Sequence, residues 1–397
     1  MLKSKALARV AALLYALTVA AAQAALPGSD TPISPREMVA RMGVGVDVTW
    51  SEVRSKIAAY TPEATRAFAA KGFRHFRLRV TQDAASVSCD YLDGQIRDAL
   101  ANGVIPIIAN TSHLLKSDPT PLNQADWVQW WADMAEHYKD YPYELMFDLI
   151  VEVTARSPLS DEPIDQLNEA YEQAVAAIRD TGGNNAERII IFGAHRRSDP
   201  TKLSQLRIPS RGNGYLIAEF HEGYASGPSI DPTSSHYYWD GTPEEIALIS
   251  RRVEAAVAWS RETGIPVWEG AWMPGNYNKG DNYDIDRQIR FASDFIGVLN
   301  RYRIPHAVNA TKKFYDVETN QWTDREPVVD HIVAVSWSPD HCSETCDETP
   351  ADNPETTGSA NRDNADGVIE TGGSGGVFWE LLTLGLIGVA RRRAWLQ

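Results

Sequence analysis

The chain has 397 residues, with 53 acidic and 38 basic side chains and a formal net charge of −15. This acidic balance argues against nucleic acid as a partner, because binding to phosphates requires a basic face. Only three cysteines occur, so a disulfide framework does not hold the fold together, although Cys342 and Cys346 are close enough in the sequence to pair across a short loop.

Residues 1–24 have the pattern of a secretory signal peptide. Lys3, Lys5 and Arg9 precede an apolar run that ends at the small-x-small sequence Ala22-Gln23-Ala24. The run is short for a membrane span, so we expect export and cleavage, with an N-terminal anchor as the alternative. Residues 25–340 are then enough for one large domain.

Eight apolar runs of strand length follow one another through this domain. They are VGVDV (44–48), HFRLRV (75–80), VIPIIAN (104–110), LMFDLIVEV (145–153), RIIIFGA (188–194), YLIAEFH (215–221), IPVWEGA (265–271) and IPHAVNA (304–310). Amphipathic stretches lie between them, some beginning with Thr-Pro-Glu and some ending in glycine, which are common helix boundaries. The alternation predicts an α/β fold, a (β/α)8 TIM barrel, with a doubly wound sheet as the alternative.

The C-terminal region differs in composition from the domain. Residues 341–371 are acidic and almost free of aliphatic side chains, which predicts a disordered linker. Residues 372–397 combine GGSGG, a short apolar stretch and three arginines, an order that resembles the GlyGly-CTERM sorting tails of Gram-negative bacteria. The resemblance implies transient inner-membrane anchoring, cleavage by a rhomboid-type protease, and a final location from the periplasm to the cell surface or beyond. A permanent single-span anchor is the alternative.

In a barrel of this kind, the active site is built at the C-terminal ends of the strands. Charged side chains gather at these predicted ends: Asp47, Arg77, Arg79, His113, Glu152, His195, Arg196, Arg197, Glu219, His221, Glu269, Lys312 and Lys313. No single element carries metal-ligand spacing, and GVGV at 43–46 is not followed by the start of a phosphate-binding helix. We therefore expect neither a metal nor a cofactor.

From about residue 43 to 322 the sequence resembles glycoside hydrolase family five, the cellulase-like retaining hydrolases. The motifs that carry the resemblance are GFRHFRLRV, NGVIPIIANTSH, AEHYKDYPYELMFDLIVEV, FHEGY and FYDVETNQW. The resemblance implies a polysaccharide or oligosaccharide substrate, with Glu152 as the acid/base. It also implies substrate-binding roles for Arg77, His113 and His221. Tyr224, Trp239 and Trp272 are further candidates for contact with sugar, and we expect a monomer.

The second carboxylate of the expected mechanism is missing from its usual place. Retaining hydrolysis requires an acid/base and a nucleophile about 5.5 Å apart. The family's seventh-strand motif aligns on PVWEGA and puts Ala271 where the nucleophile belongs. Glu269 lies two residues earlier, and on a regular strand it shares a face with Ala271. A bulge or a shortened strand is needed to bring Glu269 to the rim as a displaced nucleophile.

Three functions fit these observations. The first is a hydrolase acting on O-glycosyl bonds of a polysaccharide, with Glu152 as acid/base and Glu269 as the possible displaced nucleophile. The second is a lyase acting on an acidic, uronate-containing polysaccharide, suggested by the many basic residues at the strand ends. The third is a carbohydrate-binding pseudoenzyme, suggested by Val151 in place of the family's asparagine and by the lost aromatic residue at 308–310.

Overall fold

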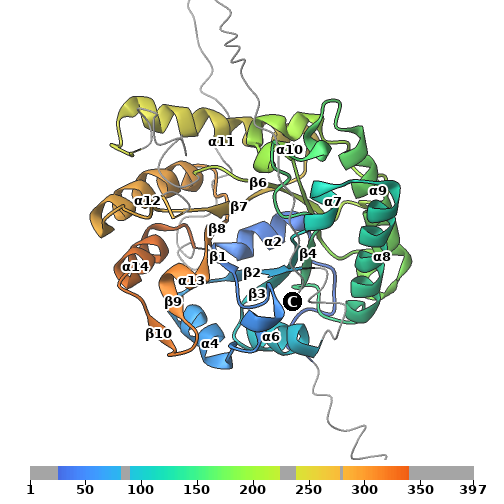
Figure 1. The fold of residues 1–397 in the computed structure, drawn as a ribbon, viewed down its shortest axis with the longest axis horizontal. Coiled ribbons are helices and arrows are strands. Elements are labelled where there is room, and N and C mark those ends of the chain that lie inside the picture. The colour runs from blue at the N-terminus through green and yellow to red at the C-terminus, as the bar shows by residue number, and fades with distance from the viewer. Residues whose placement is uncertain (1–25, 82–89, 224–237, 278–279, 339–397) are drawn as a thin grey trace, which may run out of the picture. The chain divides into compact units, whose positions relative to one another are not determined.

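The computed structural model describes residues 26–81, 90–223, 238–277 and 280–338 (Figure 1). The predicted signal peptide, the acidic linker, the sorting segment and Cys342 with Cys346 lie outside these ranges, so their assignments stay predictions. Among the helices that the described ranges contain, none is long and apolar enough to cross a membrane.

The strands form a closed barrel in which each strand pairs in parallel with its neighbours in the sequence, and the last pairs with the first. They are β1 (Val44–Val48), β2 (His75–Val80), β3 (Ile105–Asn110), β4 (Met146–Asp148), β5 (Ile190–Gly193), β6 (Leu216–Phe220), β7 (Val267–Trp272) and β8 (His306–Asn309). All eight lie in or overlap the predicted runs, and the predicted (β/α)8 TIM barrel is confirmed.

Helices surround the barrel, as Figure 1 shows for α4, α6, α8, α9, α11, α12 and α14 around the strands. The α-helices are α2 (Pro35–Met42), α3 (Arg54–Ile57), α4 (Pro62–Lys71), α6 (Asp90–Ala101), α7 (His113–Ser117), α8 (Pro121–Tyr138), α9 (Asp165–Asp180), α10 (His195–Ser198), α11 (Pro243–Thr263), α12 (Ile285–Asn300), α13 (Thr311–Phe314) and α14 (Glu326–Val335). The described ranges also contain the 3-10 helices η1 (Pro158–Ser160), η2 (Gly183–Ala186) and η3 (Pro200–Gln205) and the short strands β9 (Tyr315–Asp316) and β10 (Gln321–Trp322).

Helix α11 shows how the sequence sets these boundaries. The Thr242 side chain accepts the backbone N–H of Glu245, and the Glu245 carboxylate accepts the N–H of Thr242, which satisfies two otherwise unpaired groups. The helix ends at Thr263 and is capped by Gly264, whose φ of 76° is a left-handed conformation that glycine adopts without a steric penalty.

The barrel interior near the N-terminal ends of the strands is filled by a group of apolar side chains, which we name the apolar plug and which α2 closes. Its members come from successive strands and from the segment before β1: Ile33, Met38, Met42, Ile105, Ile107, Tyr143, Met146, Ile189, Ile191, Ile217, Trp268 and Ala307. His75 fits beside the plug only because position 45 is glycine, since a Cβ there would lie 2.2 Å from the imidazole Nε2. Burial lowers the pKa of His75 to about 4, so this imidazole is neutral and belongs to the packing.

Candidate active site

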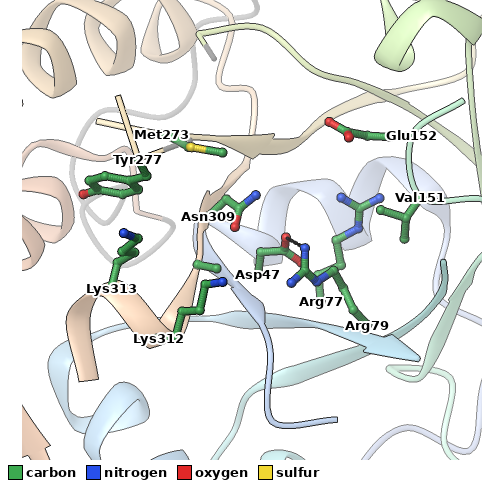
Figure 2. Close-up of a pocket in the computed structure, with 11 residues that line it drawn as sticks. Asp47, Arg77, Arg79, Val151, Glu152, Met273, Tyr277, Asn309, Lys312 and Lys313 are labelled. Atoms are coloured by element: carbon green, nitrogen blue, oxygen red, sulfur yellow. Dashed lines mark ion pairs between the residues drawn. The ribbon is translucent and has the colours of Figure 1, made fainter. Parts of the chain in front are cut away.

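A polar pocket of about 180 Å³ opens where β1, β2, β4, β7 and β8 end. Its lining residues are Asp47, Arg77, Arg79, Val151, Glu152, Met273, Tyr277, Asn309, Ala310, Lys312 and Lys313, and we name it the rim pocket (Figure 2). Two of the predicted site residues, Arg77 and Glu152, line it. Asp47, Arg79, Lys312 and Lys313 were grouped by the sequence only as charged strand ends.

Glu152 stands just after β4 on a backbone that its neighbours hold in place. Its φ is 53°, a left-handed conformation that costs a non-glycine residue on the order of 1–3 kcal/mol. Lys116 Nζ donates to the carbonyl of Val151 at 2.6 Å, and the N–H of Arg197 donates to the carbonyl of Val153 at 2.6 Å. This arrangement directs a carboxyl with a 24% exposed side chain into the rim pocket, which suits contact with a ligand.

Beneath Glu152 lies a buried group of charged side chains, which we name the charged network: Arg77, Asp148, Glu219 and His221. Arg77 donates to Asp148 Oδ2 and to Glu219 Oε2, both at 2.7 Å, and all three side chains are fully buried. His221 links the network to the pocket, because Nε2 lies 3.3 Å from Glu219 Oε2 and Nδ1 lies 3.2 Å from Glu152 Oε1. His221 is thus positioned to orient Glu152.

Electrostatics within the network keep His221 protonated near neutral pH. Burial by itself lowers the pKa of the imidazole, but Glu219 and Glu152 outweigh burial and raise this pKa to about 9. Burial raises the pKa of Asp148 to about 7 against the opposing charge of Arg77. Nearby, burial lowers the pKa of Lys116 to about 8, although Glu152 opposes that shift. The Glu152 carboxyl therefore sits among groups whose protonation changes between about pH 7 and 9.

Glu269 does not lie at the rim. A bulge does occur in β7: Glu269 pairs with His306 and Trp272 with Val308, so three steps along β7 match two along β8. However, Trp268 belongs to the apolar plug, and a Cβ on Gly270 would meet Glu219 and His221, so these two positions face the barrel interior. Because side chains alternate, Glu269 between them faces outward, which corrects the expectation that it occupies the active face.

The carboxyl of Glu269 is fully buried, and both of its oxygens accept the backbone N–H of Glu222, at 3.0 and 3.1 Å. Burial is the main reason that the pKa of Glu269 is raised well above its usual value. Glu269 is absent from the lining of the rim pocket. The sequence put Glu269 on the active face by counting back from Ala271 on a regular strand, and the bulge between Glu269 and Trp272 breaks that count.

The two tryptophans expected to contact sugar are buried in the helical layer. Trp272 is fully buried against Phe291 and Phe295 of α12, and its indole N–H donates to His306 Nδ1 at 3.0 Å. Trp239 is 1% exposed and its indole N–H donates to Asp294 Oδ2 at 2.7 Å. Neither ring has a free face for a sugar, so both expectations are corrected.

The other three residues expected to bind substrate do not line the rim pocket or are not described. His113 is exposed at the start of α7 and does not line the rim pocket. His221 acts on the pocket through Glu152 and Glu219 rather than by lining it. Tyr224 lies outside the described residues.

Asp47 is the functional candidate that the sequence did not single out. It closes β1, is 1% exposed, and lines the rim pocket. Arg79 Nη1 lies 3.4 Å from its Oδ2, whereas Oδ1 has no hydrogen-bond partner among the described residues. Burial raises the pKa of Asp47, although Arg79 and Arg77 oppose that shift. The sequence signal that could have identified Asp47 is its place near the end of a predicted strand, like that of Glu152 on the other side of the barrel.

The described residues hold no group of three or more His, Cys, Asp or Glu side chains arranged to bind a metal ion. The chemistry available in the rim pocket is that of two carboxyls and several cations. A buried charged network with a strand-end glutamate at the C-terminal face of a barrel is an arrangement suited to acid–base work on a bound ligand.

Comparison with known proteins places this barrel in a family. The model of the cellulase family, glycosyl hydrolase family 5, matches residues 41–308. The chain therefore belongs to glycosyl hydrolase family 5.

Among its relatives are two proteins of Ruminococcus albus. Endoglucanase 1 is 25% identical over 288 residues, which cover 66% of this chain and 66% of the relative. Endoglucanase B is 27% identical over 209 residues, which cover 50% of this chain and 49% of the relative. The matched region thus spans about half to two thirds of the length of these relatives.

Solved structures agree on the fold. Endoglucanase Cel5A from Thermotoga maritima has a TM-score of 0.63 at 18% identity, covering 76% of this chain and all of that one. The tri-modular endo-beta-1,4-glucanase Cel5B from Bacillus halodurans has a TM-score of 0.67 at 18% identity, covering 77% of this chain and 62% of that one.

Proposed function

We propose that this protein cleaves O-glycosyl bonds of a polysaccharide in the rim pocket, with Glu152 as the proton donor to the leaving oxygen. Family membership and the endoglucanase relatives support the reaction class. The observation that carries the proposal is the position of Glu152: partly exposed in the pocket, held on a strained backbone, and hydrogen-bonded to His221.

We further propose that Asp47, rather than Glu269, is the second carboxylate. Among the described residues that line the rim pocket, Glu152 and Asp47 are the two carboxylates. The barrel closes through β8 and β1, so β1 is three strands from β4 on one side, just as β7 is on the other. A carboxyl at the end of β1 can therefore face Glu152 across the barrel over a span similar to that of the β4 and β7 pair.

The arrangement allows either of two uses of Asp47. If its carboxylate attacks the anomeric carbon while Glu152 protonates the leaving oxygen, a glycosyl ester forms and water then releases the sugar with retention. If it instead removes a proton from an attacking water, the product is inverted. Among the described residues Oδ1 has no hydrogen-bond partner, so its lone pairs are not engaged by the protein.

Reducing-end assays on a panel of soluble β-glucans, xylan and mannan test the proposal with the full chain. We expect Glu152→Gln and Asp47→Asn each to lower turnover by at least about a hundredfold, the typical contribution of a positioned proton-transfer group. Glu269→Gln, also a carboxyl-to-amide change on a buried residue, is the matched control and should retain turnover. An Asp47→Asn variant with wild-type turnover would remove Asp47 from the mechanism.

A second candidate function is glycan binding without cleavage. Val151 contributes an apolar side chain to the rim pocket where the family has an asparagine, and Asn309 lies near the place of the family's aromatic platform. If wild-type protein is retained by a polysaccharide in affinity electrophoresis but releases no reducing ends from any substrate on the panel, the binding function replaces the hydrolase.

A further inference from the structure

One side of the rim pocket is cationic although the chain as a whole carries a net charge of −15. Arg79, Lys312 and Lys313 line the pocket on the side of β2 and α13, facing Glu152 and Val151 on the other side (Figure 2). Lys312 also lines an adjoining pocket together with Lys56, while Glu318 stands at its wall. We name Lys56, Arg79, Lys312 and Lys313 the cationic rim.

The carboxylates near the cationic rim are shared between several cations. Glu52 pairs with both Arg79 and Lys56. Asp281 pairs with both Lys313 and Arg325, each at 2.7 Å. With Asp47, which also pairs with Arg79, three carboxylates serve these four cationic side chains, and none of the three pairs with Lys312.

Arg79 has two acidic neighbours among the described residues. Its guanidinium nitrogens lie 3.4 Å from Asp47 Oδ2 and 3.4 Å from Glu52 Oε1, longer than the 2.7–2.9 Å typical of a charge-assisted hydrogen bond. The Arg79 guanidinium thus lies between two carboxylates at the wall of the rim pocket.

Lys312 has no ion pair with any residue in the described ranges. The charged groups with the largest effect on its pKa are three cations, Lys56, Arg79 and Lys313, and one carboxylate, Glu52. Burial first, and then Lys56 and Arg79, lower the pKa of Lys312. An excess of positive charge at the wall of a pocket raises the local concentration of anions.

We propose that the cationic rim is a subsite for an anionic group carried by the glycan, either a uronate carboxylate or a sulfate ester. A carboxylate or sulfate oxygen placed beside Lys312 would accept a charge-assisted hydrogen bond from its ammonium group, which forms no ion pair with the described carboxylates. The inference rests on the proposed function in one respect, which is that the proposed function places a sugar chain in the rim pocket. Recognition of the anion is independent of whether the bond is then cleaved.

Binding is measured with full-length Glu152→Gln protein, so that turnover does not enter. The calorimetric probes are a β-1,4-linked glucuronate trimer, a sulfated cellotriose and unmodified cellotriose. We expect one anionic probe to bind about tenfold or more tightly than cellotriose at low salt, with a preference that shrinks as salt is added. The anionic probe that binds more tightly identifies the group.

Substitution of Lys312 connects the preference to the cationic rim. Lys312→Gln should reduce the preference for the anionic probe over cellotriose by about fivefold to tenfold, and Lys312→Glu should reverse the preference. Lys139→Gln removes a partly exposed lysine that is paired with Glu136 and is the matched control. Because Lys312 is exposed, these variants are expected to fold.

The outcomes separate the two proposals. Equal binding of all three probes, or an anion preference that Lys312→Glu leaves unchanged, overturns the subsite. Turnover of neutral glucans by wild-type protein without any anion preference overturns the subsite alone. An anion preference in a protein without hydrolytic turnover overturns the proposed hydrolase alone. If such a protein instead forms unsaturated uronate products, seen as a rise in ultraviolet absorbance, the subsite serves a lyase.

Discussion

Replacing Glu269 by glutamine tests whether its carboxyl is structural or catalytic. In the structure it is fully buried, faces away from the barrel interior, and accepts the N–H of Glu222. Glutamine has nearly the same shape, and its amide oxygen can accept the same N–H. We therefore expect Glu269→Gln to fold normally and to retain any turnover that the wild-type protein has.

The size of the effect on stability follows from the raised pKa of Glu269. An acid whose pKa is higher in the folded than in the unfolded state favours folding at low pH, and this advantage is lost as the pH rises above the unfolded value of 4.5. Each pH unit above 4.5 at which the folded protein keeps this proton costs about 1.4 kcal/mol of stability. Glutamine does not titrate, so we expect the variant to gain about 1 kcal/mol or more at pH 7 and little at pH 4.5.

Urea denaturation of both proteins at about pH 4.5 and pH 7, together with turnover on the substrate panel, provides the measurement. The reasoning predicts a stability difference that grows with pH and turnover within about twofold of wild type. Loss of turnover with unchanged stability at both pH values would refute it, because that result would make the Glu269 carboxylate a participant in the chemistry.

Three further substitutions test the interior of the barrel by urea denaturation. Arg77→Met leaves Asp148 and Glu219 buried without their counter-charge and should cost about 3–5 kcal/mol at pH 7; a neutral result would mean that both carboxyls are protonated. His221 has a raised pKa of about 9, so the stability that it contributes is complete below about pH 6.5 and is lost as the pH rises through 9. His221→Gln should remove this loss, of about 3 kcal/mol at most, and a variant that keeps the wild-type pH profile would contradict the assignment. Gly45→Ala forces a methyl group to 2.2 Å from a buried imidazole and should cost about 1–3 kcal/mol, whereas an unchanged stability would show that the imidazole can move.

The sequence was sufficient for the barrel because parallel strands covered by helices are apolar along their whole length. β1 and β2 have the bounds that their apolar runs predicted. β4 covers only Met146–Asp148 of its run, LMFDLIVEV, and four residues beyond the strand Glu152 has a left-handed backbone conformation. Even there the backbone stays paired, since the N–H of Val151 donates to the carbonyl of Asn110 at 2.9 Å.

The site was harder to predict because the role of a residue depends on the direction in which its side chain points as well as on its position in the sequence. Glu152 and Arg77 were found through their motifs, and both line the pocket. Trp272 was misplaced because the bulge in β7 turns its ring towards α12. The pairing of Asp148 with Arg77 was not predicted, because nothing in the sequence shows that an aspartate inside an apolar strand faces an arginine two strands away.

The division of the barrel interior into an apolar plug and a charged network has a consequence for engineering. The plug, which holds Ile107, Met146 and Ile191, is formed by side chains below the site and is closed by α2. Residues of the rim pocket lie beyond it, at the ends of the strands. A designer can therefore randomise the rim positions other than Arg77 to seek new substrates, while the plug and the charged network continue to hold the barrel together. The charged network marks the depth below which such a library should not reach.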